Sequence, residues 1–250
     1  MSDEQLMRYN RQILLHDFDV PGQERLQQSR VLVVGLGGLG CPAALYLAAA
    51  GVGELLLADG DDVELSNLQR QIAHSGDDIG TNKARSAAGA IASLNPEVKL
   101  EVIPRVLVED SMPGLVARVD LVVDATDNYP VRFALNRACI AAGVPLVSGA
   151  AVRTEGQVAV FDPVRGGPCY RCLYEEGGES TALSCSESGV LAPLVGVIGS
   201  LQAMEALKLL SGFGETLRGK LLLLDLRTMD IRRLVLPPRT GCPDCAHLHP

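Results

Sequence analysis

A glycine-rich segment and the acidic residue that follows it could bind a nucleotide. Gly35, Gly37 and Gly40 form a Gly-x-Gly-x-x-Gly pattern after the apolar run VLVV and before an Ala/Leu-rich stretch. The first glycine permits a tight turn, the second lets backbone approach a phosphate, and the third lets a helix pack on a strand. Asp59 ends the next strand-like segment, where its carboxylate could accept hydrogen bonds from ribose hydroxyls. A plain tight turn with a surface Asp is the alternative, but the complete order of elements favours an adenine nucleotide.

Polar residues beyond Asp59 bear on the kind of nucleotide chemistry. Reduction with a nicotinamide cofactor needs no phosphate-cleaving groups, whereas phosphoryl or adenylyl transfer needs cations, hydrogen-bond donors and a carboxylate for Mg²⁺. The candidate donors are Asn67, Arg70, Gln71 and Lys83, and the candidate magnesium ligand is Asp127 in the segment DATDN. Each of them singly also suits a structural role as a helix charge, a helix cap or a turn residue. The residues alone therefore leave NAD and ATP both open.

Four cysteines have the spacing of a metal site. They form two Cys-x-x-Cys pairs, Cys169 with Cys172 and Cys242 with Cys245. Two such pairs can supply the four thiolates of a tetrahedral zinc site, and His247 in place of one cysteine is a less favoured set. A redox pair normally begins a helix, whereas both pairs here lie in Pro/Gly-rich segments. We therefore expect a structural zinc ion that ties the C-terminal tail to the body.

Cys185 is a further candidate for chemistry. It lies in the polar segment TALSCSESG, where an exposed thiol could attack an activated acyl group or a persulfide. No neighbouring His or Lys would lower its pKa, and Glu187 would tend to raise it. We expect Cys185 to be accessory rather than essential. Cys41 and Cys139 are expected as small core hydrophobes.

The hydrophobic pattern predicts the elements that position these residues. Ser2 and Gln5 fit a capping box at the start of an amphipathic helix over roughly residues 3 to 15. Strand-like runs occupy 31–34, 54–59, 98–103 and 120–126, and helices follow the glycine turn and span about 82–94 and 110–117. This alternation predicts right-handed crossovers and a mainly parallel, Rossmann-like α/β sheet.

Beyond residue 145 the pattern changes. The runs PLVSGA and GQVAVFDP are separated by few residues, which favours antiparallel pairing. Residues 162–192 are polar and irregular, as in a long functional or mobile loop. A long helix then ends at Gly212, before two more strand-like runs, KLLLLDL and MDIRRLVL. We expect one domain over 1–250, with a nucleotide-binding half over about 1–148 and a second half over 149–250.

Composition narrows the possible partners and compartments. The net charge is −8 and no run of Lys or Arg concentrates positive charge, so nucleic acid is an unfavourable partner. The N-terminus MSDEQLMRYNRQ is polar and no stretch of 18 residues is wholly apolar, which predicts a soluble, cytoplasmic chain without a membrane span. The odd total of 7 cysteines argues against a disulfide framework.

Taken together, the motifs resemble those of the MoeB/ThiF family of ubiquitin-activating-like adenylyltransferases. The matching segments are RYNRQI, GLGGLG, SNLQRQ, Lys83, DATDN, PCYRC and GCPDC, and they run from about residue 8 to 245. The resemblance implies that ATP with Mg²⁺ adenylates the C-terminal glycine carboxylate of a small ubiquitin-like sulfur carrier and releases pyrophosphate. A terminal carboxylate has a pKa of roughly 3.3 to 3.7, so it is already ionised and the reaction needs no general base.

The resemblance also implies roles for single residues. Asp59 would hold the ribose, while Asn67, Arg70 and Lys83 would contact the phosphates. Asp127 would bind Mg²⁺. The remaining members of the implied nucleotide-contacting set are Gly35, Gly37, Gly38, Gly40 and Gln71.

Two other positions have counterparts in the family. Arg11 is similar to an arginine that reaches into the active site of the partner subunit, which implies a homodimer. Cys185 aligns with a cysteine that some relatives use covalently and others do not need. No histidine is expected to be catalytic, and His16 and His74 are expected as surface or packing residues.

The carrier and two other functional classes stay open. Two segments, PLVSGAAVRTEGQVAVF and SGVLAPLVGVIGS, look more like the branch that activates MoaD in molybdopterin synthesis, but LADGDDVELSNLQRQ looks as much like the branch that activates ThiS, and a tRNA-thiolation branch also fits. Because the sequence stops soon after the second cysteine pair, we expect no rhodanese domain and a separate sulfurtransferase as sulfur donor. An NAD-dependent oxidoreductase would leave Arg70, Lys83 and Asp127 without a role, and a catalytically silent scaffold would not need them.

Overall fold

Eight strands form one sheet in the computed structural model, which describes residues 1–177 and 188–249. The strand order is β3-β2-β1-β4-β5-β6-β7-β8. The strands are β1 (Arg30–Val34), β2 (Glu54–Ala58), β3 (Lys99–Ile103), β4 (Leu121–Asp124), β5 (Leu146–Val152), β6 (Glu155–Phe161), β7 (Lys220–Asp225) and β8 (Asp230–Val235). Pairing is parallel from β3 to β5 and antiparallel from β5 to β8. The predicted Rossmann-like sheet with an antiparallel continuation is confirmed.

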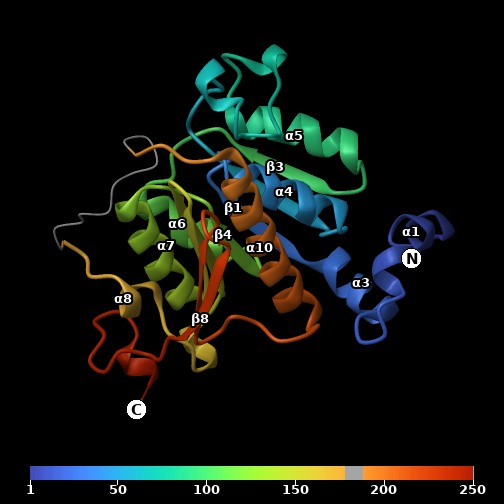
Figure 1. Cartoon of the computed structure of the whole chain (residues 1–250). Coiled ribbons are helices and arrows are strands. Elements are labelled where there is room, and N and C mark those ends of the chain that lie inside the picture. The colour runs from blue at the N-terminus through green and yellow to red at the C-terminus, as the bar shows by residue number, and fades with distance from the viewer. Residues whose placement is uncertain (178–187, 250) are drawn as a thin grey trace.

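Helices cover both faces of this sheet (Figure 1). One face carries α4 (Gly40–Ala49), α5 (Lys83–Leu94) and α10 (Ala192–Ser211), and the other carries α6 (Met112–Val116) and α7 (Tyr129–Ala142). Shorter helices are α1 (Asp3–Arg8), α2 (Asn10–Ile13), α3 (Asp19–Gln28) and α8 (Tyr170–Leu173), with 3₁₀ turns η1 (Leu65–Asn67), η2 (Gly76–Asp78), η3 (Glu109–Ser111), η4 (Pro163–Arg165) and η5 (Ala246–Leu248). This layering explains why the parallel strands are apolar on both sides.

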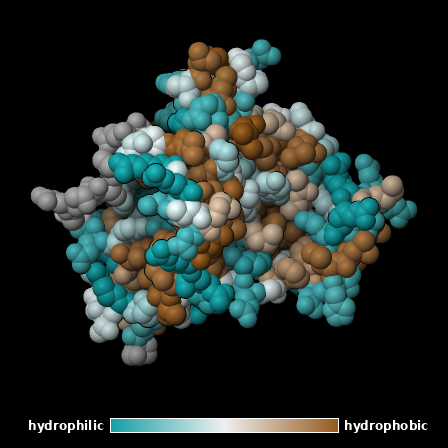
Figure 2. Space-filling model, in the orientation of Figure 1, coloured by the Kyte–Doolittle hydropathy of each residue, from teal (hydrophilic) through white to brown (hydrophobic). Residues whose placement is uncertain are grey.

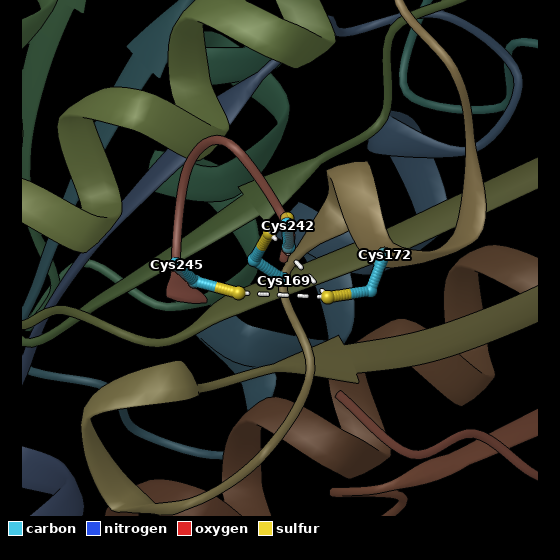
Figure 3. Close-up of side chains that lie close together, drawn as sticks. All are labelled: Cys169, Cys172, Cys242 and Cys245. Carbon is cyan, nitrogen blue, oxygen red and sulfur yellow. Dashed lines mark hydrogen bonds between the residues drawn. The ribbon is translucent and has the colours of Figure 1, made fainter. Parts of the chain in front are cut away.

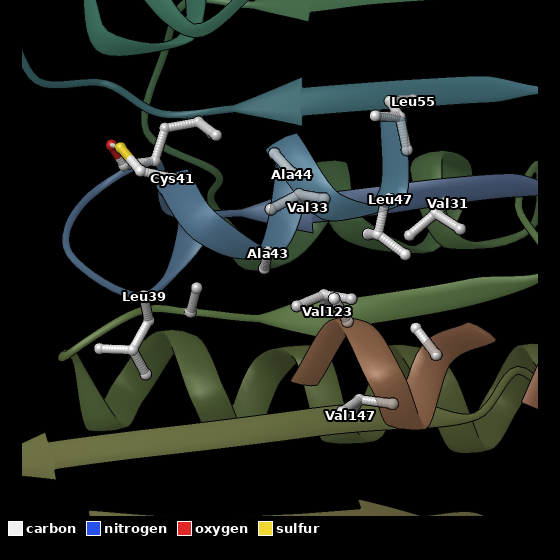
Figure 4. Packing of buried hydrophobic residues seen from close by; sticks show 14 of the residues in the cluster. Val31, Val33, Leu39, Cys41, Ala43, Ala44, Leu47, Leu55, Val123 and Val147 are labelled. Carbon is white, nitrogen blue, oxygen red and sulfur yellow. Dashed lines mark hydrogen bonds between the residues drawn. The ribbon is translucent and has the colours of Figure 1, made fainter. Parts of the chain in front are cut away.

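Strand β1 lies at the centre of the core. Val31 and Val33 pack toward α4 and α10, whereas Leu32 and Val34 pack toward α6 and α7. Figure 4 shows the first of these clusters, where small residues of α4 let the helix lie close to the sheet. Burying each such Val or Leu side chain stabilises the fold by roughly 1.5 to 3 kcal/mol, so the strand that precedes the glycine turn is held firmly.

The N-terminal region differs from the sequence prediction. The Ser2–Gln5 capping box is present, but the expected single helix divides at Tyr9 into α1 and α2. Helix α3 was not predicted, because Pro21 and Gly22 lie inside it and normally interrupt helices. Proline is tolerated in a first turn, where its missing N–H would have no partner within the helix. Gly22 in turn leaves room for the ring of Phe18, which a Cβ at this position would approach to 2.9 Å.

Helix α10 is the long helix that the sequence predicted, and it ends at Gly212, whose φ is +71°. By length and composition it could cross a membrane, but 50% of the apolar window is buried inside the protein. It packs along α4, β5 and β6. The helix is therefore accounted for as a core element of the sheet structure.

Candidate functional site

A cavity of about 830 Å³ opens at the carboxyl ends of the central parallel strands. It lies where β1 and β4 meet and the chain order of the sheet reverses, which is the usual place for ligands in open α/β sheets. The cavity collects nine of the predicted nucleotide-site residues, which are Gly35, Gly37, Gly38, Asp59, Asn67, Arg70, Gln71, Lys83 and Asp127. These residues come from five separate segments of the chain.

The glycine turn joins β1 to the start of α4. Gly35 adopts φ of +88°, a backbone conformation that favours glycine. A Cβ on Gly40 would come within 1.8 Å of the Gly35 carbonyl oxygen, so only glycine allows this close approach of helix and turn. Gly40 is thus a packing position, whereas Gly37 and Gly38 border the cavity beside the amino end of α4, where backbone dipoles favour an anion.

Asp59 follows β2 and is bonded to two backbone amides. Its Oδ2 accepts from the N–H of Leu36 at 2.6 Å, and its Oδ1 accepts from the N–H of Asp61 at 2.8 Å. Burial raises the pKa of Asp59, although these two hydrogen bonds act to lower it. A carboxylate has about four acceptor positions, so two remain that could receive ribose hydroxyls.

Lys83 and Arg70 are two of the cations that line the cavity. Lys83 begins α5 and its Nζ lies 2.9 Å from Oδ2 of Asp61, whose side chain is 70% exposed. Arg70 is half-buried and donates to the carbonyl oxygen of Ser66 at 3.1 Å. Lys83 itself is buried, with 10% of its side chain exposed, but its partner carboxylate lies at the surface, so a phosphate in the cavity could replace that partner.

Asn67 and Gln71 are buried on the same wall. Asn67 accepts at Oδ1 from the backbone N–H of Glu64 at 3.2 Å and so closes η1. Gln71 is only 4% exposed, and its Oε1 has no hydrogen-bond partner. Leaving such an oxygen unpaired costs roughly 1 to 3 kcal/mol, which a donor on a bound ligand or a water would offset. The unpaired amide therefore fits a nucleotide in this cavity.

Asp127 is exposed at the mouth of the cavity, in the loop between β4 and α7. The next residue, Asn128, caps α7 by accepting from the N–H of Val131 at 3.2 Å. Arg132 of α7 also restrains this loop, because its Nε donates to the carbonyl oxygen of Thr126 at 3.1 Å. Asp127 is thus an exposed carboxylate that lines the cavity and is accessible to a cation.

Arg132 was not predicted from the sequence. It is 6% exposed, and its Nε lies 3.7 Å from Oδ2 of the fully buried Asp124. Burial acts most strongly on Arg132 and lowers its pKa, but the charge of Asp124 and interactions with Tyr170 and Tyr174 together raise it, so the guanidinium stays charged. The available signal was an arginine within a largely apolar helix segment, in VRFALNRACI.

Asp124 is itself hydrogen-bonded by residues of the loop that follows β4, of β5 and of α10. Its carboxylate accepts from Thr126 Oγ1 at 2.7 Å and from Ser148 Oγ on β5 at 2.8 Å. Gln202 of α10 donates to the Asp124 backbone oxygen at 2.7 Å. The end of β4, from which the Asp127 loop departs, is therefore fixed from both faces of the sheet.

The four cysteines of the two pairs converge on one another (Figure 3). The Sγ separations are 3.9 Å for Cys169 to Cys172, 3.6 Å for Cys169 to Cys242 and 3.5 Å for Cys172 to Cys245. Tetrahedral zinc with bonds of about 2.3 Å requires sulfur separations of about 3.8 Å. The geometry fits one zinc ion, which would hold all four sulfurs as thiolates.

One argument from the sequence is corrected here. The first pair does not lie in an irregular loop, since Cys169 directly precedes the one-turn helix α8 and Cys172 is inside it. The position at a helix start therefore does not separate redox from metal-binding cysteines in this chain. The convergence of four sulfurs does, because a redox pair needs only two.

The cysteine cluster is joined to helix α7. Asp244, between the last two cysteines, accepts from Asn136 Nδ2 of α7 at 3.0 Å and pairs with Arg171 at 3.0 Å. The backbone N–H of Arg239 donates to the sulfur of Cys172 at 3.3 Å. These contacts tie the C-terminal tail to the body, and the expected contribution of zinc to this link stays a prediction.

Arg11 lies apart from the cavity. Arg11 is exposed and lines a second groove of about 470 Å³, formed by α1, α2, α4 and α10. Met204 in this groove is 50% exposed, and Figure 2 shows hydrophobic side chains interspersed with polar ones on the visible face. Cys185 lies outside the described residues.

Known proteins are similar to this chain in sequence or in fold. A model of the ThiF family matches residues 9–244. The chain is 53% identical over 245 residues to molybdopterin-synthase adenylyltransferase of Escherichia coli strain K12, covering 98% of each chain. It is 47% identical over 245 residues to the sulfur carrier protein ThiS adenylyltransferase of the same strain, covering 98% of this chain and 97% of that one. The crystal structure of PaaA matches with a TM-score of 0.82 at 27% identity, covering 95% of this chain and 75% of the other.

Proposed function

The chain belongs to the ThiF family and is an adenylyltransferase, and from this premise we propose that it adenylates the C-terminal glycine carboxylate of a small ubiquitin-like sulfur-carrier protein. A carboxylate oxygen attacks the α-phosphorus of ATP, the bond to the β-phosphate oxygen breaks, and pyrophosphate leaves. One observation carries the proposal. A single cavity holds the glycine turn, a half-buried acceptor for ribose and several cations, among them Lys83 and Arg70.

Each residue has a role in this reaction. Asp59 holds the ribose, and the turn at Gly37 and Gly38 offers backbone N–H groups to the phosphates. Arg70 and Lys83 neutralise the charge that develops on the leaving pyrophosphate. Asp127 is the ligand for Mg²⁺, which when bound neutralises phosphate charge. Asn67 and Gln71 complete the wall with amide donors and acceptors. No residue acts as a general base, since the attacking carboxylate is already ionised.

The carrier that we propose is MoaD-like. The higher identity to the molybdopterin-synthase enzyme, 53% against 47% for the ThiS enzyme, supports this choice. ThiS or a tRNA-thiolation carrier is the alternative for the same reaction. Residues of about 1–148 bind the nucleotide and those of 149–250 bind the carrier and zinc. A separate sulfurtransferase supplies the sulfur, and the reaction takes place in the cytoplasm.

We propose that the active form is a homodimer. Arg11 is outside the cavity of its own chain and beside an apolar groove, so a second copy on this groove would let Arg11 serve the other nucleotide site. Zinc at the four cysteines has a structural role, because the cluster joins the C-terminal tail to α7 and lines neither cavity. Cys185 would be an accessory nucleophile.

The test is ATP–pyrophosphate exchange with Mg²⁺ and purified MoaD-like or ThiS-like carrier. Exchange is expected with the intact MoaD-like carrier and is expected to vanish when its terminal glycines are removed. Exchange with the ThiS-like carrier alone would reassign the partner but keep the chemistry. No exchange with either, together with enhanced NADH fluorescence on mixing, would favour the oxidoreductase, and the absence of Trp from the chain makes that fluorescence easy to read.

A further inference from the structure

His74 is buried below the glycine turn, in contact with two segments of the nucleotide cavity. It is 8% exposed and follows the Asn67–Gln71 wall. Its Nε2 lies 3.0 Å from the carbonyl oxygen of Leu36, and its Nδ1 lies 2.7 Å from Oγ of Ser86 on α5. Neither the nucleotide contacts nor the chemistry assigned above uses this ring.

The hydrogen-bond partners determine which nitrogen of the ring carries the proton. A carbonyl oxygen can only accept, so Nε2 must donate to Leu36. In the neutral ring Nδ1 is then an acceptor, and the hydroxyl of Ser86 donates to it. Cys41 also donates to the same carbonyl oxygen from Sγ at 3.2 Å. The oxygen of Leu36 is therefore held inside the protein by two donors.

The direction of this carbonyl fixes the direction of the next amide. Peptide groups are planar and no cis bond occurs among the described residues, so the N–H of Gly37 points opposite to the C=O of Leu36. Since that C=O faces His74 in the interior, the Gly37 N–H is directed to the other side, where Gly37 borders the cavity. A flipped peptide would instead present a carbonyl oxygen to the phosphates and repel them.

The turn needs such a restraint. Leu36 lies between Gly35 and Gly37, and glycines on both sides give the backbone an unusual freedom to rotate. The Leu36 N–H is fixed by Asp59 at 2.6 Å, but this bond belongs to the preceding peptide group. Among the described residues, His74 and Cys41 are the groups that bond to the peptide carrying the Gly37 amide, and a thiol is the weaker donor of the two.

We propose that His74 is a positioning residue for ATP, which holds the Leu36–Gly37 peptide so that the Gly37 N–H faces the phosphates. The proposal rests on the proposed function, in which the cavity binds ATP. A positioning role differs from a packing role in its consequence. Loss of the His74 side chain should weaken binding of the phosphates and leave binding of the nucleoside unchanged.

The test compares three proteins by calorimetric titration with ATP and with adenosine. His74→Asn puts its amide nitrogen near the position of Nδ1 and cannot reach Leu36, whereas His74→Gln puts its amide nitrogen near Nε2 and can still donate. His74→Asn is expected to raise the Kd for ATP about tenfold, which corresponds to about 1.4 kcal/mol or one buried hydrogen bond, and to leave the Kd for adenosine unchanged. His74→Gln is expected to restore most of the ATP affinity.

Several outcomes would overturn this assignment of His74. Unchanged ATP affinity in His74→Asn would do so, and so would an equal loss for ATP and adenosine, which would indicate general loosening. If wild-type protein does not bind ATP, the proposed function fails before the role of His74 is reached. If His74→Asn does not fold, Ser86→Ala replaces it, because loss of that hydroxyl frees the ring. A smaller ATP-specific loss is then expected, and an unchanged ratio of the two Kd values would overturn the proposal.

Discussion

The nucleotide cavity and the cysteine cluster are built in opposite ways. Four identical ligands from two short motifs make the cluster, and their sulfurs lie within 4.8 Å of one another. The cavity instead draws unlike side chains from five segments, and these are oriented by groups such as Arg132, which also lines the cavity, and His74, which lies behind it. Loss of any one cysteine should therefore disrupt the whole metal site. Loss of one cavity residue should instead remove only the contribution of that residue.

The largest expected effect is the loss of metal from the cluster. Cys242→Ser should remove zinc and lower the melting temperature by about 10 °C, since a loss of about 3 to 5 kcal/mol shifts Tm by about 2 to 4 °C per kcal/mol in a chain of this size. Metal content by plasma mass spectrometry and Tm by calorimetry measure this. Cys139→Ser, at a buried cysteine outside the cluster, is the control and should keep its zinc. Full stability without metal would contradict the structural role.

Arg132→Met should be the next most damaging change. It leaves the buried carboxylate of Asp124 without its cation, which costs about 3 to 5 kcal/mol when one partner of a buried pair is removed. Chemical denaturation measures the free energy of unfolding. The double variant Arg132→Met with Asp124→Asn should recover much of that stability but not the exchange activity, because the Asp127 loop still lacks its support. Recovery of both the stability and the exchange activity would show that Arg132 does not support the nucleotide site.

Lys83→Ala should affect activity and spare the fold. Lys83 is 8% exposed, but its partner Asp61 lies at the surface, so loss of the ion pair should cost little stability, whereas loss of one charge-stabilising group in the site slows the reaction by roughly 10² to 10³. The rate of ATP–pyrophosphate exchange and the Tm are measured together. Arg85→Ala, at an exposed residue of the same helix, is the matched control and should change neither. A normal rate in Lys83→Ala would remove this residue from the mechanism.

The smallest effect concerns pH. Burial raises the pKa of Asp59 above its usual 3.8, so the carboxyl group takes up a proton at a higher pH than an ordinary Asp. For the ligand-free protein, this group contributes stability that is present below 3.8 and is lost as pH rises through the raised value. The effect of pH on ribose binding is opposite to its effect on stability. Protonated Asp59 has fewer acceptor positions for the ribose hydroxyls, so binding weakens as pH falls.

Adenosine affinity should therefore fall as the pH is lowered from neutrality, and the fall should begin above pH 3.8. Adenosine is the ligand of choice, since it has no phosphates that titrate. Calorimetric titration of wild type and Asp59→Asn gives the comparison. The variant should bind more weakly at neutral pH and lack this pH dependence, and the same profile in both proteins would assign the titration to another group.

How far the sequence predicts each region follows from the same contrast. The cysteines, the glycine turn and Asp59 were predictable because each depends on a local spacing or on the end of a strand. Arg132 and His74 were not, because their importance depends on burial against segments that the sequence does not connect to them. Helix α3 was missed for a third reason, since Pro21 and Gly22 break helices in most contexts but not in a first turn.

The most direct measurement follows the carboxylate oxygen of the carrier. A MoaD-like carrier with ¹⁸O in its C-terminal carboxylate is incubated with the enzyme, ATP and Mg²⁺, and hydroxylamine is added to cleave the acyl-adenylate. The account predicts AMP that carries one ¹⁸O, because a carboxylate oxygen attacked the α-phosphorus. Unlabelled AMP, or ADP as the nucleotide product, would contradict it.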